Sequence, residues 1–220
     1  MNIVWYGHSC FKIQTKPWRK SEEVTIFTDP FDKAIGIRPP QGSADIVSVS
    51  HFHYDHNNID AIKGDPFVID SPGEYEIKGV QIEGIDSFHD KVEGKEKGRN
   101  TIFVIDSEGI RVCHLGDLGH ALNQEQLDQI GSVDILLIPV GGKYTLDADL
   151  AEKVCGQIEP KIIIPMHFKV EGLKIDLDDE KKFLSAMGSK FENNTPKLTL
   201  KAKELGEIES KIIVMNINGN

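Results

Sequence analysis

Three histidines and an aspartate lie within six residues of this sequence, in the stretch SVSHFHYDHNN. Imidazole nitrogens and carboxylate oxygens are the usual ligands of catalytic zinc and related divalent metals. The preceding run DIVSVS is typical of a short buried strand, and residues two apart at the end of a strand point the same way. His51 and His53 are therefore expected to bind one ion. Asp55 and His56 follow at the next turn, and two ions with two of these ligands each fit this spacing better than one ion.

Three more candidate ligands occur at the ends of other apolar runs. They are His89 in DSFHD, Asp117 in HLGD and His167 in PMHF, and a loop is predicted to begin at each. A carboxylate has two oxygens, so Asp117 could bridge two cations. We expect these three side chains to complete a catalytic metal site that begins with the histidine cluster.

Four other polar residues could lie beside that site. His8 could be a histidine in a β-turn whose ring nitrogens are hydrogen-bonded, or it could lie near the metals. Asp29 in FTDPF is predicted to orient a ligand imidazole, with turn capping as the alternative. His120 could line the pocket and donate a proton, or it could face solvent. His114 is out of phase with the aspartate that follows it on its strand, so a role outside the site is predicted.

The stretch VGGKYT follows a predicted buried strand. Gly141 and Gly142 allow close approach of the backbone, so their N–H groups could hold a substrate anion. A plain tight turn is the alternative. Tyr144 and Thr145 could contact the substrate on the same grounds.

Composition restricts the class of protein and its partners. The 220 residues carry a formal charge of −10, which disfavours phosphate backbones as partners, so no nucleic acid is expected. Three widely spaced cysteines without a CxxC pair indicate reduced core thiols in an intracellular protein. The first residues lack the pattern of a signal peptide, and no apolar run reaches the length of a membrane segment. We expect a cytoplasmic protein, with a homo-oligomer left open.

The order of predicted elements indicates an α/β or α+β layered domain spanning residues 1–220. The first half favours strands, at 2–15, 23–29, 45–50, 67–70, 74–88 and in a hairpin over 100–117. The second half alternates, with predicted helices at 123–130, 147–158 and 176–187 and strands at 134–140, 161–168, 197–205 and 211–218. Asn123 is expected to cap its helix, and the glycine-rich loop 90–100 is expected to be mobile.

The motif HFHYDH matches the HxHxDH signature of the metallo-β-lactamase superfamily. His89, Asp117 and His167 occur in the order of that superfamily's later ligand motifs. More narrowly, the chain resembles small predicted hydrolases related to ascorbate-phosphate lactonase and to the N-acyl phosphatidylethanolamine phospholipase D group. WYGHSCF, FTDPF, GGKYT and PMHF carry this narrower resemblance, which extends from about residue 2 to residue 167.

The resemblance implies an α+β fold, an αββα sandwich of two mixed β-sheets flanked by helices, with the metals at one edge. It implies two divalent ions, with zinc favoured and manganese or iron as alternatives. Carried over by position, the first ion is held by His51, His53 and His89, the second by Asp55, His56 and His167, and Asp117 bridges both.

The expected activity is that of a metal-dependent hydrolase. Two ions about 3.5–4 Å apart share a water and lower its pKa towards about 7. The metal-bridged hydroxide would attack a small ester, lactone or phosphodiester substrate, with Asp55, Asp117 and His120 as candidate catalytic residues. Two alternatives are a nuclease of the same fold and a non-catalytic metal-binding regulatory module.

Overall fold

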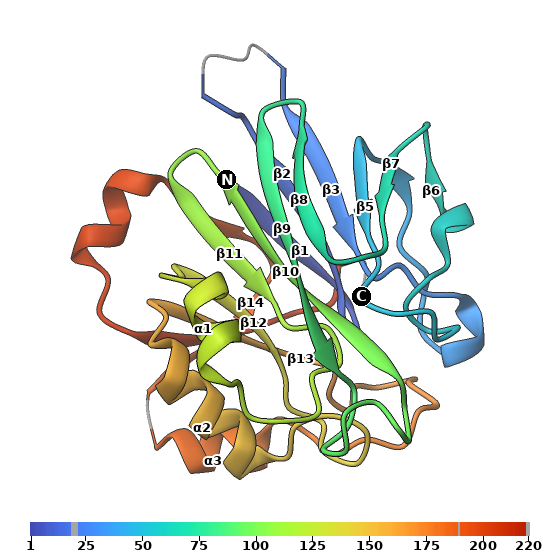
Figure 1. The fold of residues 1–220 in the computed structure, drawn as a ribbon, viewed down its shortest axis with the longest axis vertical. Helices are drawn as coiled ribbons and strands as arrows, with labels where there is room; N and C mark the ends of the chain where they lie inside the picture. The colour runs from blue at the N-terminus through green and yellow to red at the C-terminus, as the bar shows by residue number, and fades with distance from the viewer. Residues whose placement is uncertain (19–21, 189, 219–220) are drawn as a thin grey trace.

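Two β-sheets packed face to face form the body of the protein. The computed structural model describes residues 1–18, 22–188 and 190–218. Figure 1 shows the long strands β9 and β10 crossing in front of β1, β2 and β3, with helices α1, α2 and α3 gathered at the lower left. This is the α+β sandwich expected from the sequence.

The first sheet has six strands in the order β15-β1-β2-β3-β5-β7. They are β1 (Asn2–Gly7), β2 (Cys10–Thr15), β3 (Val24–Thr28), β5 (Ile46–Ser48), β7 (Phe67–Ile69) and β15 (Leu198–Thr199). β2 is antiparallel to both β1 and β3, whereas β3, β5 and β7 are mutually parallel. β1, β3 and β5 therefore all end at the same edge of this sheet.

The second sheet has eight strands in the order β14-β16-β13-β12-β11-β10-β9-β8. They are β8 (Gly73–Ile77), β9 (Val80–Phe88), β10 (Arg99–Ser107), β11 (Ile110–His114), β12 (Ile135–Pro139), β13 (Ile162–Met166), β14 (Phe191–Thr195) and β16 (Lys211–Met215). β11, β12 and β13 are parallel, and β10 is antiparallel to both β9 and β11. The carboxyl ends of β9, β11, β12 and β13 therefore share one edge. A further pair, β4 (Gly42–Ser43) and β6 (Ile62–Lys63), stands apart.

Strands β3 and β5 of the first sheet are buried on both faces, which explains their apolar sequence, whereas β1 and β2 alternate between buried and partly exposed residues. Ile26 and Ile46 point into the main core between the sheets. Their neighbours Phe27 and Val47 point the other way, into a second cluster with Phe31 and other residues outside the first sheet. The three cysteines, Cys10, Cys113 and Cys155, are free and buried, as predicted.

Three α-helices occur in the described part of the chain: α1 (Gln124–Ile130), α2 (Ala148–Ile158) and α3 (Lys181–Met187). Asn123 caps α1 in a capping box with Gln126, which confirms the predicted cap. Three short 3-10 turns complete the set: η1 (Lys33–Ile35), η2 (Ile59–Ala61) and η3 (Ala202–Glu207). No helix among the described residues has the length and apolar character needed to cross a membrane.

Two element predictions near the C-terminus are wrong in extent. The helix predicted over 176–187 begins only at Lys181, because the backbone of Asp178 bonds to Gly141 and Lys169 instead. The strand predicted over 197–205 is limited to the two residues of β15, which pair with the start of β1, and the chain then turns into η3. In both places a tertiary contact replaces the element that the local pattern favours.

The loop 90–100 is also more ordered than its composition predicts. The carboxylate of Asp90 accepts four backbone N–H groups, from Val92, Gly94, Glu96 and Lys97, at 2.8–3.0 Å. Glycine and charge alone indicate mobility, but one buried acceptor here organises the whole turn.

Candidate metal centre

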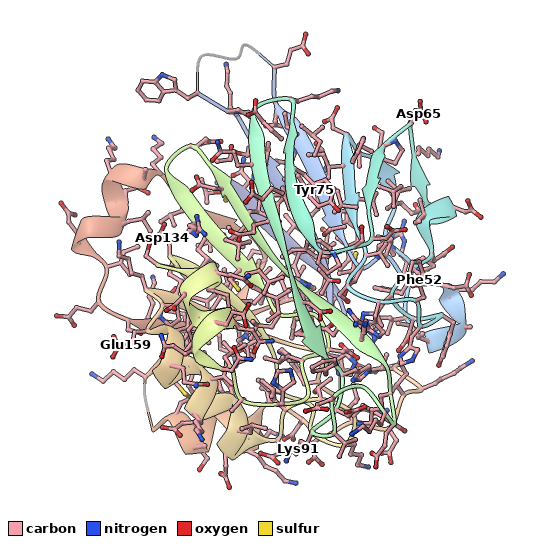
Figure 2. The ribbon with its side chains drawn as sticks, in the orientation of Figure 1. Phe52, Asp65, Tyr75, Lys91, Asp134 and Glu159 are labelled. Carbon is pink, nitrogen blue, oxygen red and sulfur yellow. The ribbon has the colours of Figure 1, made fainter. Side chains whose placement is uncertain are left out.

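The candidate ligands all lie in loops at the common carboxyl edge of the two sheets. The HxHxDH segment follows β5, His89 follows β9, and His167 follows β13. Asp117 lies three residues beyond β11, and His8 lies in the turn between β1 and β2. In Figure 2 Phe52, from the loop after β5, lies at the right and Lys91, from the loop after β9, at the bottom, while Asp134, at the amino end of β12, lies at the left.

Asp117 stands between the histidines of both halves of the predicted site. Its Oδ2 is 3.2 Å from Nε2 of His89, 3.1 Å from Nε2 of His167 and 3.4 Å from Nε2 of His56. The same oxygen lies 4.0 Å from Nε2 of His51. A single carboxylate among four imidazole nitrogens is the arrangement that a bridging ligand requires.

The donor atoms form three overlapping groups, in each of which all the ligand atoms lie within 4.8 Å of one another. The groups are His51, His53 and His89; His51, His56 and Asp117; and His8, Asp55, His56 and His167. Nε2 of His51 and Oδ1 of Asp117 are buried and have no hydrogen-bond partner. Buried polar atoms without a partner are costly, and a divalent cation would satisfy both, so the residues fit a metal centre.

Asp29 holds two of these imidazoles in the orientation that metal binding needs. Its Oδ2 accepts the hydroxyl of Ser50 at 2.6 Å and Nδ1–H of His56 at 3.0 Å. The Ser50 hydroxyl in turn accepts Nδ1–H of His51 at 2.9 Å. With both Nδ1 atoms donating, Nε2 of each ring faces the site, and a metal that binds there takes the place of any proton on Nε2.

The protonation of the cluster follows from burial and neighbouring charge. Burial, reinforced by His56, lowers the pKa of His51 to about 2, so its ring is neutral at ordinary pH. Burial also lowers the pKa of His8 to about 4. Burial disfavours the charged forms of His56 and Asp117 as well, but neighbouring groups outweigh it: Asp117 and Asp29 act on His56, and His167 and His56 act on Asp117. The pKa of His56 is therefore raised well above its usual value and that of Asp117 lies well below.

Three residues at the site adopt left-handed backbone conformations, which are rare for residues other than glycine. The φ angles are 53° at His8, 39° at Asp29 and 52° at His167. Each follows directly on a strand end or lies in a tight turn, and all three are buried. Such strain is typical of functional sites, where the surrounding structure fixes a side chain in position.

A cavity of about 650 Å³ opens beside the ligands. Its walls include His53, Asp55, His89, Asp117 and His167. The remaining lining residues include Tyr54, Tyr144, Lys97 and Lys174. Nζ of Lys97 donates to the backbone oxygen of Tyr144 at 2.6 Å, which joins the loop after β9 to the loop after β12.

The structure argues against a proton-donor role for His120. Its Nε2 accepts the backbone N–H of Phe88 at 3.1 Å, and its Nδ1 donates to the carbonyl of Ala121 at 2.8 Å. Both ring nitrogens are thus occupied by backbone, and His120 is not among the cavity-lining residues. His114 is also structural, as predicted: it is buried, donates from Nε2 to the Ser9 carbonyl and accepts the Gly116 N–H.

The loop after β12 is a packed turn rather than an anion cradle. The N–H of Gly142 donates to the carbonyl of Leu146, so it is not free for a substrate. A Cβ at Gly141 would lie 2.1 Å from the carbonyl oxygen of His167, so only glycine fits there. Tyr144 lines the cavity, whereas Thr145 is buried and does not.

Sequence reasoning missed three contributors to the site. Ser50 links Asp29 to His51, and its position just before the HxHxDH motif is the signal that could have identified it. Lys97 and Lys174 line the cavity from loops far apart in the sequence. No local pattern marks either lysine.

Comparisons with known proteins agree with this geometry. Residues 2–167 match the family described as the beta-lactamase superfamily domain. A crystal structure from Thermotoga maritima, described as a proposed Zn-dependent hydrolase of the metallo-β-lactamase superfamily, is 41% identical with a TM-score of 0.77, and the match covers 97% of each chain.

A relative from Thermoplasma volcanium, named a UPF0173 metal-dependent hydrolase, is 28% identical over 86% of this chain and 93% of its own length. The diiron β-hydroxylase CmlA of Streptomyces venezuelae shares the fold at 14% identity, with a TM-score of 0.64 over 91% of this chain and 54% of its own. The chain belongs to the metallo-β-lactamase superfamily, among relatives named as metal-dependent hydrolases.

Proposed function

We propose that this protein is a binuclear metal-dependent hydrolase that acts on a small ester, lactone or phosphodiester. The position of Asp117 Oδ2, within 3.4 Å of nitrogens from His56, His89 and His167, carries the proposal. When bound, two divalent ions would lower the pKa of water towards about 7 and polarise the electrophilic oxygen of the substrate.

The side chains divide into two sets that share Asp117. His51, His53 and His89 would hold the first ion, and Asp55, His56 and His167 the second. Asp29 keeps His56 in the metal-binding tautomer directly and His51 through Ser50. Zinc is favoured by the name of the Thermotoga maritima relative, and the imidazole and carboxylate donors also suit manganese or iron.

The charge of the cavity favours an anionic substrate. The positive charge of two divalent ions would exceed the negative charge of Asp55 and Asp117. Lys97 and Lys174 add further positive charge at the cavity wall. Asp176 also lines the cavity, but Lys143 pairs with it. The rings of Tyr54 and Tyr144, which are 63% and 44% exposed, offer apolar contact beside the ions. A substrate with one anionic group and one apolar group satisfies both features.

Replacement of Asp117 with alanine tests the proposal. We expect the variant to lose metal and turnover while keeping its fold, because alanine removes the shared ligand without adding bulk. Asp65→Ala, a change at an exposed loop carboxylate, is the matched control and should retain both.

The measurements are metal content of purified protein, circular dichroism, and hydrolysis of a panel of ester, lactone and phosphodiester reporters. Unchanged turnover in Asp117→Ala would refute the assigned site. A wild-type protein that carries two ions and is inert across the panel would instead support the non-catalytic metal-binding module.

A further inference from the structure

The turn between β1 and β2 brings one more imidazole to the second set of ligands. His8 is fully buried, and its Nε2 lies 3.1 Å from Oδ2 of Asp55 and 3.1 Å from Nε2 of His56. Its ring also lies against that of His167, with centroids 4.2 Å apart. His8 therefore faces all three residues assigned to the second ion.

We propose that His8 is a direct ligand of the second metal ion through Nε2, which gives that ion four ligands from this chain in addition to the shared Asp117. The inference rests on the proposed binuclear site and deepens it. Donor atoms of His8, Asp55, His56 and His167 all lie within 4.8 Å of one another, so one ion can reach all four.

Hydrogen bonding alone accounts poorly for this arrangement. Nε2 of a neutral His8 can donate one proton, which Asp55 would take. The same nitrogen could instead accept a proton from Nε2 of His56, but it cannot do both, so one of its two 3.1 Å contacts is left without a hydrogen bond. A cation shared by the two nitrogens and the carboxylate satisfies all three atoms.

His8 also has the features of the two ligand histidines that come from the second sheet. Nδ1 of His8, like Nδ1 of His89 and His167, is buried and has no hydrogen-bond partner. The backbone fixes its position, because the His8 carbonyl accepts the N–H of His167 at 3.1 Å and the indole N–H of Trp5 at 3.0 Å. The left-handed φ of 53° at His8 completes this fixed placement.

The consequence is an asymmetric pair of ions. The first would have three imidazoles and Asp117, whereas the second would have three imidazoles, Asp55 and Asp117. Five protein donors exceed the four of a closed zinc site and suit a metal of higher coordination number, such as manganese or iron. The open position for substrate would then lie with the first ion, which has one protein donor fewer, although ligands of both ions line the cavity.

Three variants of the full chain test the assignment. His8→Asn removes the donor and tolerates the left-handed backbone, and His8→Gln restores a hydrogen-bond donor towards Asp55. His53→Asn is the matched control, because it removes one imidazole from the first ion. Stepwise chelator competition with Co²⁺ gives the affinity of each ion, and NMR of the Co²⁺-loaded protein detects the shifted imidazole N–H of each ligand.

We expect His8→Asn to lower the affinity for one ion at least about 100-fold. This exceeds the 10- to 100-fold loss of affinity typical when a residue that only orients a ligand is replaced. It should remove one shifted imidazole resonance, whereas His53→Asn should weaken the other ion. Wild-type affinity in His8→Gln, or an unchanged set of resonances in His8→Asn, would overturn the assignment of His8 alone. Failure of the wild-type chain to bind two ions would instead overturn the binuclear site.

Discussion

Replacing Asp29 with asparagine should lower the affinity of the protein for both metal ions while leaving the chain folded. The Asp29 carboxylate is fully buried and accepts three donors: the Ser50 N–H at 2.7 Å, the Ser50 hydroxyl at 2.6 Å and Nδ1–H of His56 at 3.0 Å. Asparagine has the same shape and tolerates the left-handed φ of 39° at this position. The change therefore isolates the loss of one acceptor oxygen.

The loss of metal affinity can be estimated from the N–H donors for which asparagine provides no acceptor. If the amide oxygen faces Ser50 Oγ and His56, the amide NH₂ meets the Ser50 N–H, donor against donor. If the amide is turned round, His56 must move its proton to Nε2, which is the metal-binding atom. One unpaired buried donor costs about 1–3 kcal/mol, which corresponds to roughly a 10- to 100-fold loss of metal affinity.

The assay is stepwise removal of metal by a chelator of known affinity, with thermal unfolding of the metal-free protein measured separately. Asp45→Asn is the control, because Asp45 also accepts a backbone N–H, from Thr25, but lies at the opposite end of β5. Ser50→Ala should weaken binding of the first ion more than that of the second, since His51 is the one proposed ligand that the Ser50 hydroxyl contacts directly. If Asp29→Asn binds both ions within about twofold of wild type, the orienting role assigned to Asp29 is refuted.

Three further outcomes are expected. His120→Gln should retain metal and turnover, because both ring nitrogens serve the backbone; a fall in turnover of more than about tenfold, or about 1.4 kcal/mol, would contradict this. Gly141→Ala should destabilise the protein by about 1–3 kcal/mol in urea unfolding and weaken the second ion, because its Cβ would meet the His167 carbonyl; wild-type stability would refute the packing argument. Burial lowers the pKa of His56, but Asp117 outweighs it and raises that pKa well above its usual value. Metal-free protein should therefore hold His56 protonated near pH 7, lose that stabilisation as pH rises through the raised pKa, and release at least about one proton per chain on metal binding. Calorimetry in buffers of different ionisation enthalpy measures this release, and a value of zero would contradict the protonation state.

Much of the metal centre could be predicted because its ligands are local in the chain. Four of them fall in HFHYDH, and the others follow apolar runs that form β9, β11 and β13. Parallel strand direction places such residues at one edge of a sandwich, so residue type and strand ends are enough to assemble them. The same reasoning named His120 as a candidate catalytic residue and left Gly142 open between an anion site and a tight turn, because the polar atoms of both are used by nearby backbone in turns that no periodicity describes.

Sequence alone thus determined the metal-dependent class, the α+β fold and most of the proposed ligand set, because these depend on residue types at the ends of apolar runs. Only the tertiary structure decided which polar neighbours reach those ligands. The contact of His8 with Asp55 spans 47 residues, and that of Asp29 with His56 spans 27. Both exist because β1, β3 and β5 end side by side in one sheet, and strand order of this kind is set by packing of the whole core.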